Sequence, residues 1–501
     1  MVRHALTMMS GTLASRVLGL AREMVTAALF GATAGLDAFL VAYALSNMAR
    51  QMLAEGALSA SFVPVFTRLL ASEKKDEASL LARQICTLLS LAGGAVVLAG
   101  IICAPWLTRL MAPGFEGETF AAAVRQTRQL FPFLLLVSWA ALAMGALNSL
   151  GRFLTSSLAP ALSNLIYIVV ALALAPRLGL AALVVAVLAG GVAQLGLQVY
   201  WLYRSEGMSL LPAKPDFQNP ALRQALALFV PFALGLSINQ LNPLLTRAFG
   251  SFLTEGSISV LNYSNRVIQL PLGLVVIAIS QALLPELSRL SKGEEFIALL
   301  RSALAFTAFL VLPLTVGTML VAGPVVHLLF VRGAFGLAAW QGTATTLFWS
   351  ALGLPAMAAS TVALRALYAL EMRRAPLLVA GSNVVALFFA CLVLSPLWGV
   401  DGLALGGTIA FAVSAGLSLI LVWRKTGFAP WPSLRVLGGL ALATGVMGLV
   451  CGLLISWWPY SPSASLTARC GWLAAVGGLG ALVYGFVSFF TCKEAWRQLR
   501  S

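Results

Sequence analysis

Charged residues are scarce in this sequence. Of its 501 residues only 10% are Asp, Glu, Lys or Arg, whereas 60% are hydrophobic. A soluble protein carries roughly 25% charged residues, so the soluble globular class is excluded. The apolar residues come in long blocks rather than in short alternating segments, which predicts membrane-spanning helices and argues against a barrel. The chain is therefore expected to be an all-α integral membrane protein.

The residue types of common catalytic and metal sites are also scarce or badly spaced. The two histidines, His4 and His327, are far apart in the sequence, and the six cysteines form no CxxC pair. No Gly-Lys dipeptide is present, which excludes a phosphate-binding P-loop and hence an ATP-driven pump built from this chain alone. No GxSxG nucleophile motif occurs. We therefore expect no enzyme activity, no metal site and no cofactor.

Apolar blocks long enough to cross a bilayer follow one another along the chain, since a transmembrane helix needs about 20 apolar residues. The sequence predicts fourteen of them, near 5–29, 36–60, 80–108, 128–150, 156–175, 180–203, 224–249, 257–284, 298–321, 338–368, 376–395, 400–423, 435–457 and 470–491. Because this number is even, both termini are expected on the same side of the membrane.

The basic residues indicate which side that is. Twenty Lys or Arg residues fall at the helix ends and in the loops that share a face with the N-terminus, and six fall on the opposite face. Cytoplasmic loops are enriched in Lys and Arg, so both termini are expected in the cytoplasm. This topology accounts for most of the net charge of +15, and the charge therefore gives no reason to expect nucleic-acid binding.

The two halves of the sequence repeat one another at an offset near 220 residues. PVFTRL at 64–69 returns as PELSRL at 285–290, Pro176 and Gly179 return as Pro396 and Gly399, and Arg204 with Gly207 returns as Arg424 with Gly427. Each copy holds six predicted helices, so the copies run in the same direction through the membrane, as in transporters with parallel repeats. The expected organisation is a six-helix lobe at 1–204, a cytoplasmic interlobe linker at 205–222, a second six-helix lobe at 223–425 and two extra helices at 426–501.

Several arginines lie inside the apolar blocks, where a charge costs a few kcal/mol and usually faces a cavity. Arginine presents a planar set of donors that pairs with phosphate oxygens. The first two predicted helices hold three arginines with three acidic residues, and this cluster predicts a site for a phosphate or pyrophosphate. Its members are Arg16, Arg22, Arg50, Glu23, Asp37 and Glu55.

Two polar stripes extend the candidate site. Asn47 is expected on the same helix face as Arg50, three residues later. In the block at 257–284 a polar stripe follows i, i+3, i+7 and i+10 on an otherwise apolar helix, and Arg266 is expected to face the first-lobe arginines across a central cleft. This stripe consists of Ser259, Asn262, Arg266 and Gln269. For Arg247 and Arg365 the sequence leaves open whether they line a cavity or reach the membrane surface from a helix end.

One stretch of the sequence, at 15–66, reads SRVLGLAREMVTAALFGATAGLDAFLVAYALSNMARQMLAEGALSASFVPVF. It resembles the MurJ/MviN lipid II flippase family, in the multidrug/oligosaccharidyl-lipid/polysaccharide exporter superfamily. Its matching elements are SRVLGxxRE, Asp37-Ala38-Phe39, AEGA at 54–57 and FVP at 62–64. The similarity continues in the second lobe at NYSNRVIQLPLG, 262–273.

This resemblance implies a flippase that moves lipid II, the undecaprenyl-pyrophosphate-linked peptidoglycan precursor, from the inner to the outer leaflet of the bacterial cytoplasmic membrane by alternating access. It implies that the pyrophosphate and headgroup are bound by Arg16, Arg22, Arg50 and Arg266, and that further polar cavity positions are Asp37, Asn47, Glu55 and Ser259. The two extra helices resemble the family's groove for the lipid tail. Expected partners are lipid II and membrane lipids, and the source of energy is left open between a coupling ion and the membrane potential.

Alternatives to this function also stay open. A polysaccharide-lipid flippase and a cation-coupled drug exporter share the same fold, although a drug exporter should have a carboxylate-rich cavity, which the clustered arginines disfavour. A membrane scaffold without transport activity would explain the helices but would leave the buried charges without a purpose.

Overall fold

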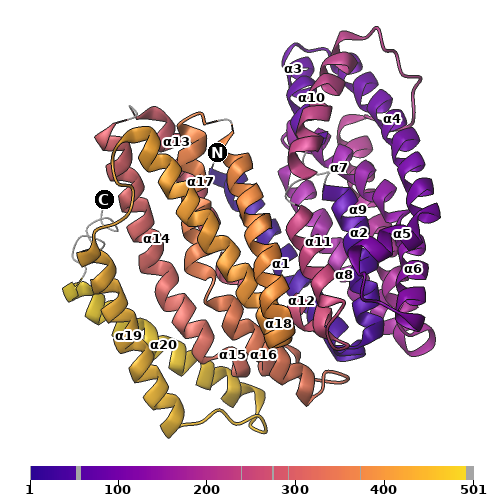
Figure 1. Ribbon diagram of the computed structural model, residues 1–501. Coiled ribbons are helices and arrows are strands. Elements are labelled where there is room, and N and C mark those ends of the chain that lie inside the picture. The colour runs from indigo at the N-terminus through magenta and orange to yellow at the C-terminus, as the bar shows by residue number, and fades with distance from the viewer. Residues whose placement is uncertain are drawn as a thin grey trace. The chain divides into compact units, whose positions relative to one another are not determined.

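The computed structural model describes residues 2–51, 58–237, 240–272, 276–290, 293–372 and 374–491. Every regular element in these ranges is a helix (Figure 1), which confirms the all-α class. The helices pack into two compact units, Met1–Gly256 and Ser257–Ser501.

The first unit contains helices α1 to α11. Their bounds are α1 Val2–Phe30, α2 Ala34–Arg50, α3 Ser59–Ala71, α4 Lys75–Ile102, α5 Ala104–Met111, α6 Gly117–Leu130, α7 Phe133–Ser149, α8 Phe153–Leu178, α9 Ala181–Glu206, α10 Pro220–Ser237 and α11 Leu241–Gly250. α1 packs along α8, and α10 packs against α3 and α4. Thr33 begins α2, because its hydroxyl accepts the Leu36 N–H at 3.3 Å.

The second unit contains helices α12 to α20. Their bounds are α12 Ser257–Pro271, α13 Ile277–Arg289, α14 Glu294–Leu320, α15 Ala322–Phe330, α16 Leu337–Ala351, α17 Leu354–Ala369, α18 Ala375–Thr426, α19 Leu434–Trp457 and α20 Leu466–Thr491. α18 consists of two helices joined at a kink at Gly399. The last two helices, α19 and α20, lie side by side, and both contact α14 (Figure 1).

The predicted linker at 205–222 covers the end of α9, the loop that follows and the start of α10. It lies inside the first compact unit, where the loop is held on α4. Arg83 Nε donates to the Leu211 carbonyl at 3.0 Å, and the Thr87 hydroxyl donates to the Ala213 carbonyl at 2.7 Å. The two compact units are divided by packing, whereas the predicted lobes are copies of a repeat. The lobe boundaries at 1–204 and 223–425 therefore stay a prediction.

The number of membrane spans is not confirmed as fourteen. Among the described residues, 8 helices are long and apolar enough to cross a membrane, or up to 9 if α16 and α17, bent by 44° relative to each other, form one span. α18 counts once in this number although it contains two of the predicted blocks. Several other predicted blocks coincide with helices that are short or interrupted, such as α10 with α11 and α12 with α13.

Equivalent positions of the repeat are buried in the cores of both units. The core formed by α3, α4, α7 and α9 includes Phe62, Phe66, Leu81, Leu142 and Leu202. The core formed by α13, α14, α17 and α18 includes Leu283, Leu287, Leu300, Val362 and Val422. Each residue of the second set follows its counterpart at the predicted offset, so the same helix faces point inward in both copies, as expected for a parallel repeat.

Two pairs of glycines repeat the backbone conformation as well. Gly179, between α8 and α9, has φ 55° and ψ −136°, and Gly399, at the kink of α18, has φ 56° and ψ −129°. Gly207 and Gly427 both end a helix in the left-handed conformation. Residues other than glycine rarely adopt such positive φ values, which explains why the repeat keeps glycine at these points.

A polar and aromatic cluster joins α15 to α20 and to the segment at 458–465. The Nδ1 atom of His327 lies 2.9 Å from the Tyr460 hydroxyl and 3.4 Å from Nη1 of Arg469. Arginine can only donate, so Nδ1 must be an acceptor and the imidazole must be neutral. Burial, and then the Arg469 charge, lower the pKa of His327.

This geometry predicts that acid weakens the attachment of α20 to α15. Since the folded-state pKa of His327 lies below the ordinary value of about 6.5, its contribution to stability is complete above that value and is lost as the pH falls below it. We expect the melting temperature of the purified protein to drop between pH 7.5 and pH 5. The drop should be smaller in His327→Gln, whose amide oxygen accepts but does not titrate. Equal drops in both proteins would contradict the assignment.

Candidate functional site

The predicted site residues lie on three helices. In the first unit, α1 carries Arg16 and Arg22, and α2 carries Asp37, Asn47 and Arg50. In the second unit, α12 carries Ser259, Asn262, Arg266 and Gln269. Glu55 lies outside the described residues.

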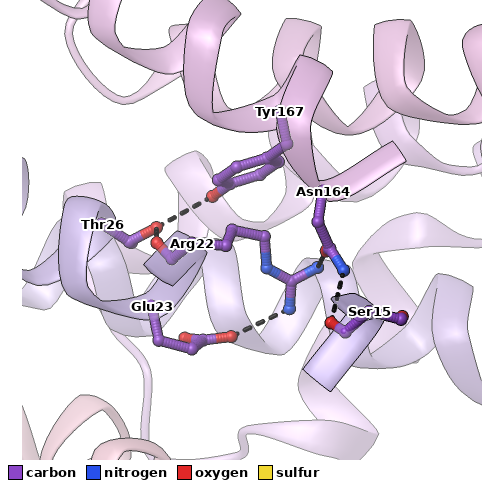
Figure 2. A network of polar contacts seen from close by, with 6 residues as sticks. All are labelled: Ser15, Arg22, Glu23, Thr26, Asn164 and Tyr167. Carbon is purple, nitrogen blue, oxygen red and sulfur yellow. Dashed lines mark hydrogen bonds and ion pairs between the residues drawn. The ribbon is translucent and has the colours of Figure 1, made fainter. Parts of the chain in front are cut away.

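Arg22 is the centre of a polar network between α1 and α8. Its Nη2 donates to Glu23 Oε1 at 2.8 Å, and its Nη1 donates to Asn164 Oδ1 at 3.3 Å (Figure 2). The amide of Asn164 in turn donates to the Ser15 carbonyl at 3.3 Å. The side chains of Arg22 and Glu23 are only 17% and 7% exposed, so this ion pair is screened much less than one at the surface.

Two aromatic rings flank the Arg22 guanidinium. Its Cζ atom lies 5.3 Å from the ring centroid of Tyr167 on α8 and 5.9 Å from that of Tyr43 on α2. A cation is attracted to a ring face at such distances. Guanidinium has five N–H donors, and in the described part of the chain only two acceptors, on Glu23 and Asn164, receive them. No acceptor among the described residues receives its other N–H groups.

Arg50 belongs to the same neighbourhood. Its Nε donates to Asn47 Oδ1 at 2.8 Å, which confirms that the two residues share a helix face. Arg50 also interacts electrostatically with Tyr43 and with Arg22. Two arginines near each other repel, and an anion bound between or beside them relieves that repulsion. The structure thus brings together two of the three arginines predicted in the first two helices.

Arg16 has a different environment. Its side chain is exposed, and it lies six residues before Arg22, or roughly 9 Å along the helix axis. Among the described residues it makes no hydrogen bond or ion pair with the Arg22 network. Its assignment to the headgroup site stays a prediction.

Asp37 lies in the first turn of α2, at the end opposite Arg50. It is 3% exposed, and its Oδ2 accepts the backbone N–H of Gly256 at 2.8 Å. Gly256 has φ +85°, and a Cβ atom there would lie 2.6 Å from the Ala32 carbonyl oxygen. In this structure Asp37 therefore fastens the segment after α11 to the turn between α1 and α2. Its predicted place in the cavity is not tested by this contact.

On α12 the predicted stripe runs from a buried to an exposed end. Ser259 is fully buried, Asn262 and Arg266 are half-buried, and Gln269 is exposed. Ser259, Asn262 and Arg266 all take part in polar interactions. The role of these residues in binding stays a prediction.

Of the two arginines left open, Arg247 folds back on its own helix, because its Nη1 donates to the Pro243 carbonyl at 3.2 Å. Arg365 on α17 is half-buried, and its Nε is buried with no hydrogen-bond partner in the described part of the chain. The same part of the chain contains no group of three or more His, Cys, Asp or Glu side chains that could hold a metal ion.

Sequence reasoning missed the residues that hold Arg22 in place. Thr26, Tyr43, Asn164 and Tyr167 were not among the predicted site residues. A signal for two of them exists, since Asn164 and Tyr167 are polar residues at i and i+3 inside the apolar block 156–175 and therefore share a helix face. The pairing of that face with α1 cannot be read from either helix alone.

Comparison with known sequences gives consistent matches over most of the chain. The family model described as "Lipid II flippase MurJ" matches residues 26–469. A probable lipid II flippase MurJ of Rhizobium meliloti is 33% identical over 494 residues, which are 95% of this chain and 92% of the relative. The lipid II flippase MurJ of Burkholderia cenocepacia is 31% identical over 473 residues, with 91% of each chain covered.

Solved structures show the same fold. A lipid II flippase MurJ in an inward closed conformation superposes with a TM-score of 0.82 at 24% identity and covers 99% of this chain and 100% of its own. An inward-facing multidrug resistance MATE family transporter of the MOP superfamily superposes with a TM-score of 0.69 at 15% identity, covering 84% of this chain and 98% of its own.

Proposed function

Because the chain belongs to the MurJ family of lipid II flippases, we propose that it moves lipid II from the inner to the outer leaflet of the bacterial inner membrane by alternating access, with Arg22 and Arg50 binding the pyrophosphate. The observation that supports this proposal is the set of contacts that the Arg22 side chain makes. It is held by one carboxylate, one amide and two ring faces, and the rest of its N–H groups can pair with phosphate oxygens.

Arg266 and Arg16 complete the proposed headgroup site, and Asn47, Ser259, Asn262 and Gln269 supply neutral polar groups. The two extra helices, α19 and α20, form the groove for the lipid tail. Both termini lie in the cytoplasm, as the distribution of basic residues supports. The family is one of transporters, and we infer no chemical reaction at this site.

The alternatives on this fold predict different substrates. A cation-coupled drug exporter would need carboxylates that are free to bind cations, whereas Glu23 is paired with Arg22 at 2.8 Å and Asp37 accepts a backbone N–H. A polysaccharide-lipid flippase would use the same pyrophosphate chemistry and differ in the glycan that it accepts.

The test of this function uses the full-length protein in lipid vesicles that contain lipid II. We expect the protein to increase the rate at which an external reagent reaches lipid II of the inner leaflet. A polyprenyl-pyrophosphate that carries another glycan and an organic cation should not be moved at a comparable rate. Transport of either compound without transport of lipid II would overturn the proposal in favour of the corresponding alternative.

We further propose that the membrane potential drives the return of the empty carrier. A charge moved fully across the membrane exchanges about 2.3 kcal/mol per 100 mV. Glu23 neutralises Arg22, so the net charge of the empty site comes from the other arginines, and bound pyrophosphate would cancel it. A potential that is negative inside then favours the empty, positive site facing the cytoplasm.

The expected result is slower flipping when the potential is removed at constant pH and sodium concentration. A potassium gradient with a potassium carrier sets the potential across vesicles, and the accessibility of lipid II is followed over time. An unchanged rate at zero potential would rule out this mechanism and leave an ion or the substrate supply as the driving force.

A further inference from the structure

Tyr167 of α8 is linked to Arg22 in two ways, directly through its ring, which lies near the guanidinium, and indirectly through its hydroxyl, which lies near Thr26. The Thr26 hydroxyl donates to the Arg22 carbonyl at 2.9 Å and lies 3.1 Å from the Tyr167 hydroxyl (Figure 2). A threonine hydroxyl has a single hydrogen, and here it is given to the carbonyl. The Tyr167 hydroxyl must therefore be the donor to Thr26. Through Thr26, Tyr167 is fixed to the backbone of the residue whose guanidinium lies 5.3 Å from its ring centroid.

The contact between Tyr167 and Thr26 is shielded from solvent. Tyr167 is 5% exposed and Thr26 is 4% exposed. Asn164 precedes Tyr167 by three residues, so the two side chains lie on one face of α8. That face gives Arg22 an amide oxygen that accepts one of its N–H groups and an aromatic ring near its Cζ atom.

An aromatic ring has one advantage over a second carboxylate as the neighbour of an arginine that binds pyrophosphate. Arg22 is already paired with one carboxylate, Glu23, so a second carboxylate would take up further N–H groups and give the pair a net negative charge that repels pyrophosphate. A ring face attracts the cation without taking up those N–H groups and without adding negative charge.

We infer that Tyr167 is a positioning residue for the pyrophosphate-binding arginine. Its ring orients the Arg22 guanidinium, and its hydroxyl, through Thr26, fixes the ring relative to the backbone of α1. Tyr43 contributes the second ring. This inference rests on the proposed function, because it gives Tyr167 a role only in the binding of a substrate by Arg22.

The test measures lipid II binding and flipping by the full-length protein in nanodiscs and vesicles, together with its melting temperature. Tyr167→Phe keeps the ring and should retain affinity within about threefold. Tyr167→Leu removes the ring and should weaken lipid II binding about tenfold. Thr26→Ser keeps the hydroxyl and should resemble the unmodified protein, whereas Thr26→Val should lower affinity about as much as Tyr167→Phe.

A matched control is available in the second unit. Thr315 of α14 is also 4% exposed, and its hydroxyl donates to the carbonyl four residues earlier at 2.8 Å. Thr315→Val therefore removes the same kind of buried hydroxyl away from Arg22. It should leave the affinity for lipid II unchanged.

A double-mutant cycle separates positioning from general stability. If Tyr167 acts through Arg22, Tyr167→Leu should have little further effect on the residual binding of Arg22→Ala. Equal losses in both backgrounds, or full affinity of Tyr167→Leu in the unmodified background, would overturn the inference while lipid II transport by the unmodified protein stands. Absence of lipid II binding and transport in the unmodified protein would instead overturn the proposed function, and this inference with it.

Discussion

Arg22→Ala is expected to abolish lipid II flipping. Hydrogen bonds to charged groups contribute about 1.5–3 kcal/mol each, so loss of two bonds to pyrophosphate corresponds to a binding defect of roughly 100-fold or more. Arg22→Lys should recover only part of the activity, since lysine keeps the charge but loses the planar set of donors. Flipping in vesicles and growth of a strain that depends on this protein measure both effects.

The substitution also breaks the buried Arg22–Glu23 ion pair, and removal of one member of a buried ion pair by itself destabilises a protein. The double variant Arg22→Ala with Glu23→Gln removes the charge of Glu23 as well, and it should restore the melting temperature without restoring flipping. Arg109 provides a matched control, because its Cζ lies 4.2 Å from the Phe120 ring centroid in another part of the first unit. Arg109→Ala should flip lipid II normally. Normal flipping by Arg22→Ala would refute the site assignment.

Gly256→Ala is expected to destabilise the first unit strongly. Gly256 has φ +85°, a Cβ there would lie 2.6 Å from the Ala32 carbonyl oxygen, and its N–H donates to buried Asp37. The left-handed conformation costs a residue other than glycine about 1–2 kcal/mol, and the close contact and the disturbed hydrogen bond add to this. We expect the melting temperature to fall by roughly 5 °C or more.

Gly117 is the control for the backbone term alone. It has φ +50°, and a Cβ at this position would meet no atom within 4 Å. Gly117→Ala should therefore lower the melting temperature clearly less than Gly256→Ala. If both substitutions lower the melting temperature equally, the close contact with Ala32 does not contribute to the destabilisation.

Many details of the fold could be predicted, because each feature of the first copy of the repeat predicts an equivalent feature in the second copy. A buried position such as Phe66 predicts its partner Leu287, and the turn at Gly179 predicts the kink at Gly399. The number of spans could not be settled in the same way. Hydropathy records neither where a helix breaks, as between α16 and α17, nor how charges such as Arg22 are accommodated.

The charged residues of the site could be predicted from the sequence, whereas the residues that hold them in place could not. Arg50 and Asn47 share a face because helical spacing requires it. The contacts of Arg22 with Asn164 and with the Tyr167 ring, in contrast, join residues more than 140 positions apart. The hydrogen bond between Asp37 and Gly256 shows the same limit. A carboxylate near charged neighbours suggests an ion pair, and only the structure reveals that it accepts the N–H of Gly256.

The turns at Gly179 and Gly399 bear on how the chain enters the membrane during synthesis. At each of them two apolar helices are joined with almost no polar residues in between. If the first helix of a pair inserted alone, the apolar surface of the second helix would stay exposed to water outside the bilayer, which is unfavourable. Each pair is therefore expected to leave the translocon as one preassembled hairpin. A polar tag inserted after Gly179 should make α8 and α9 insert in two separate steps. The same tag after Gly207, which is exposed at the end of α9, should leave the joint insertion of α8 and α9 unchanged.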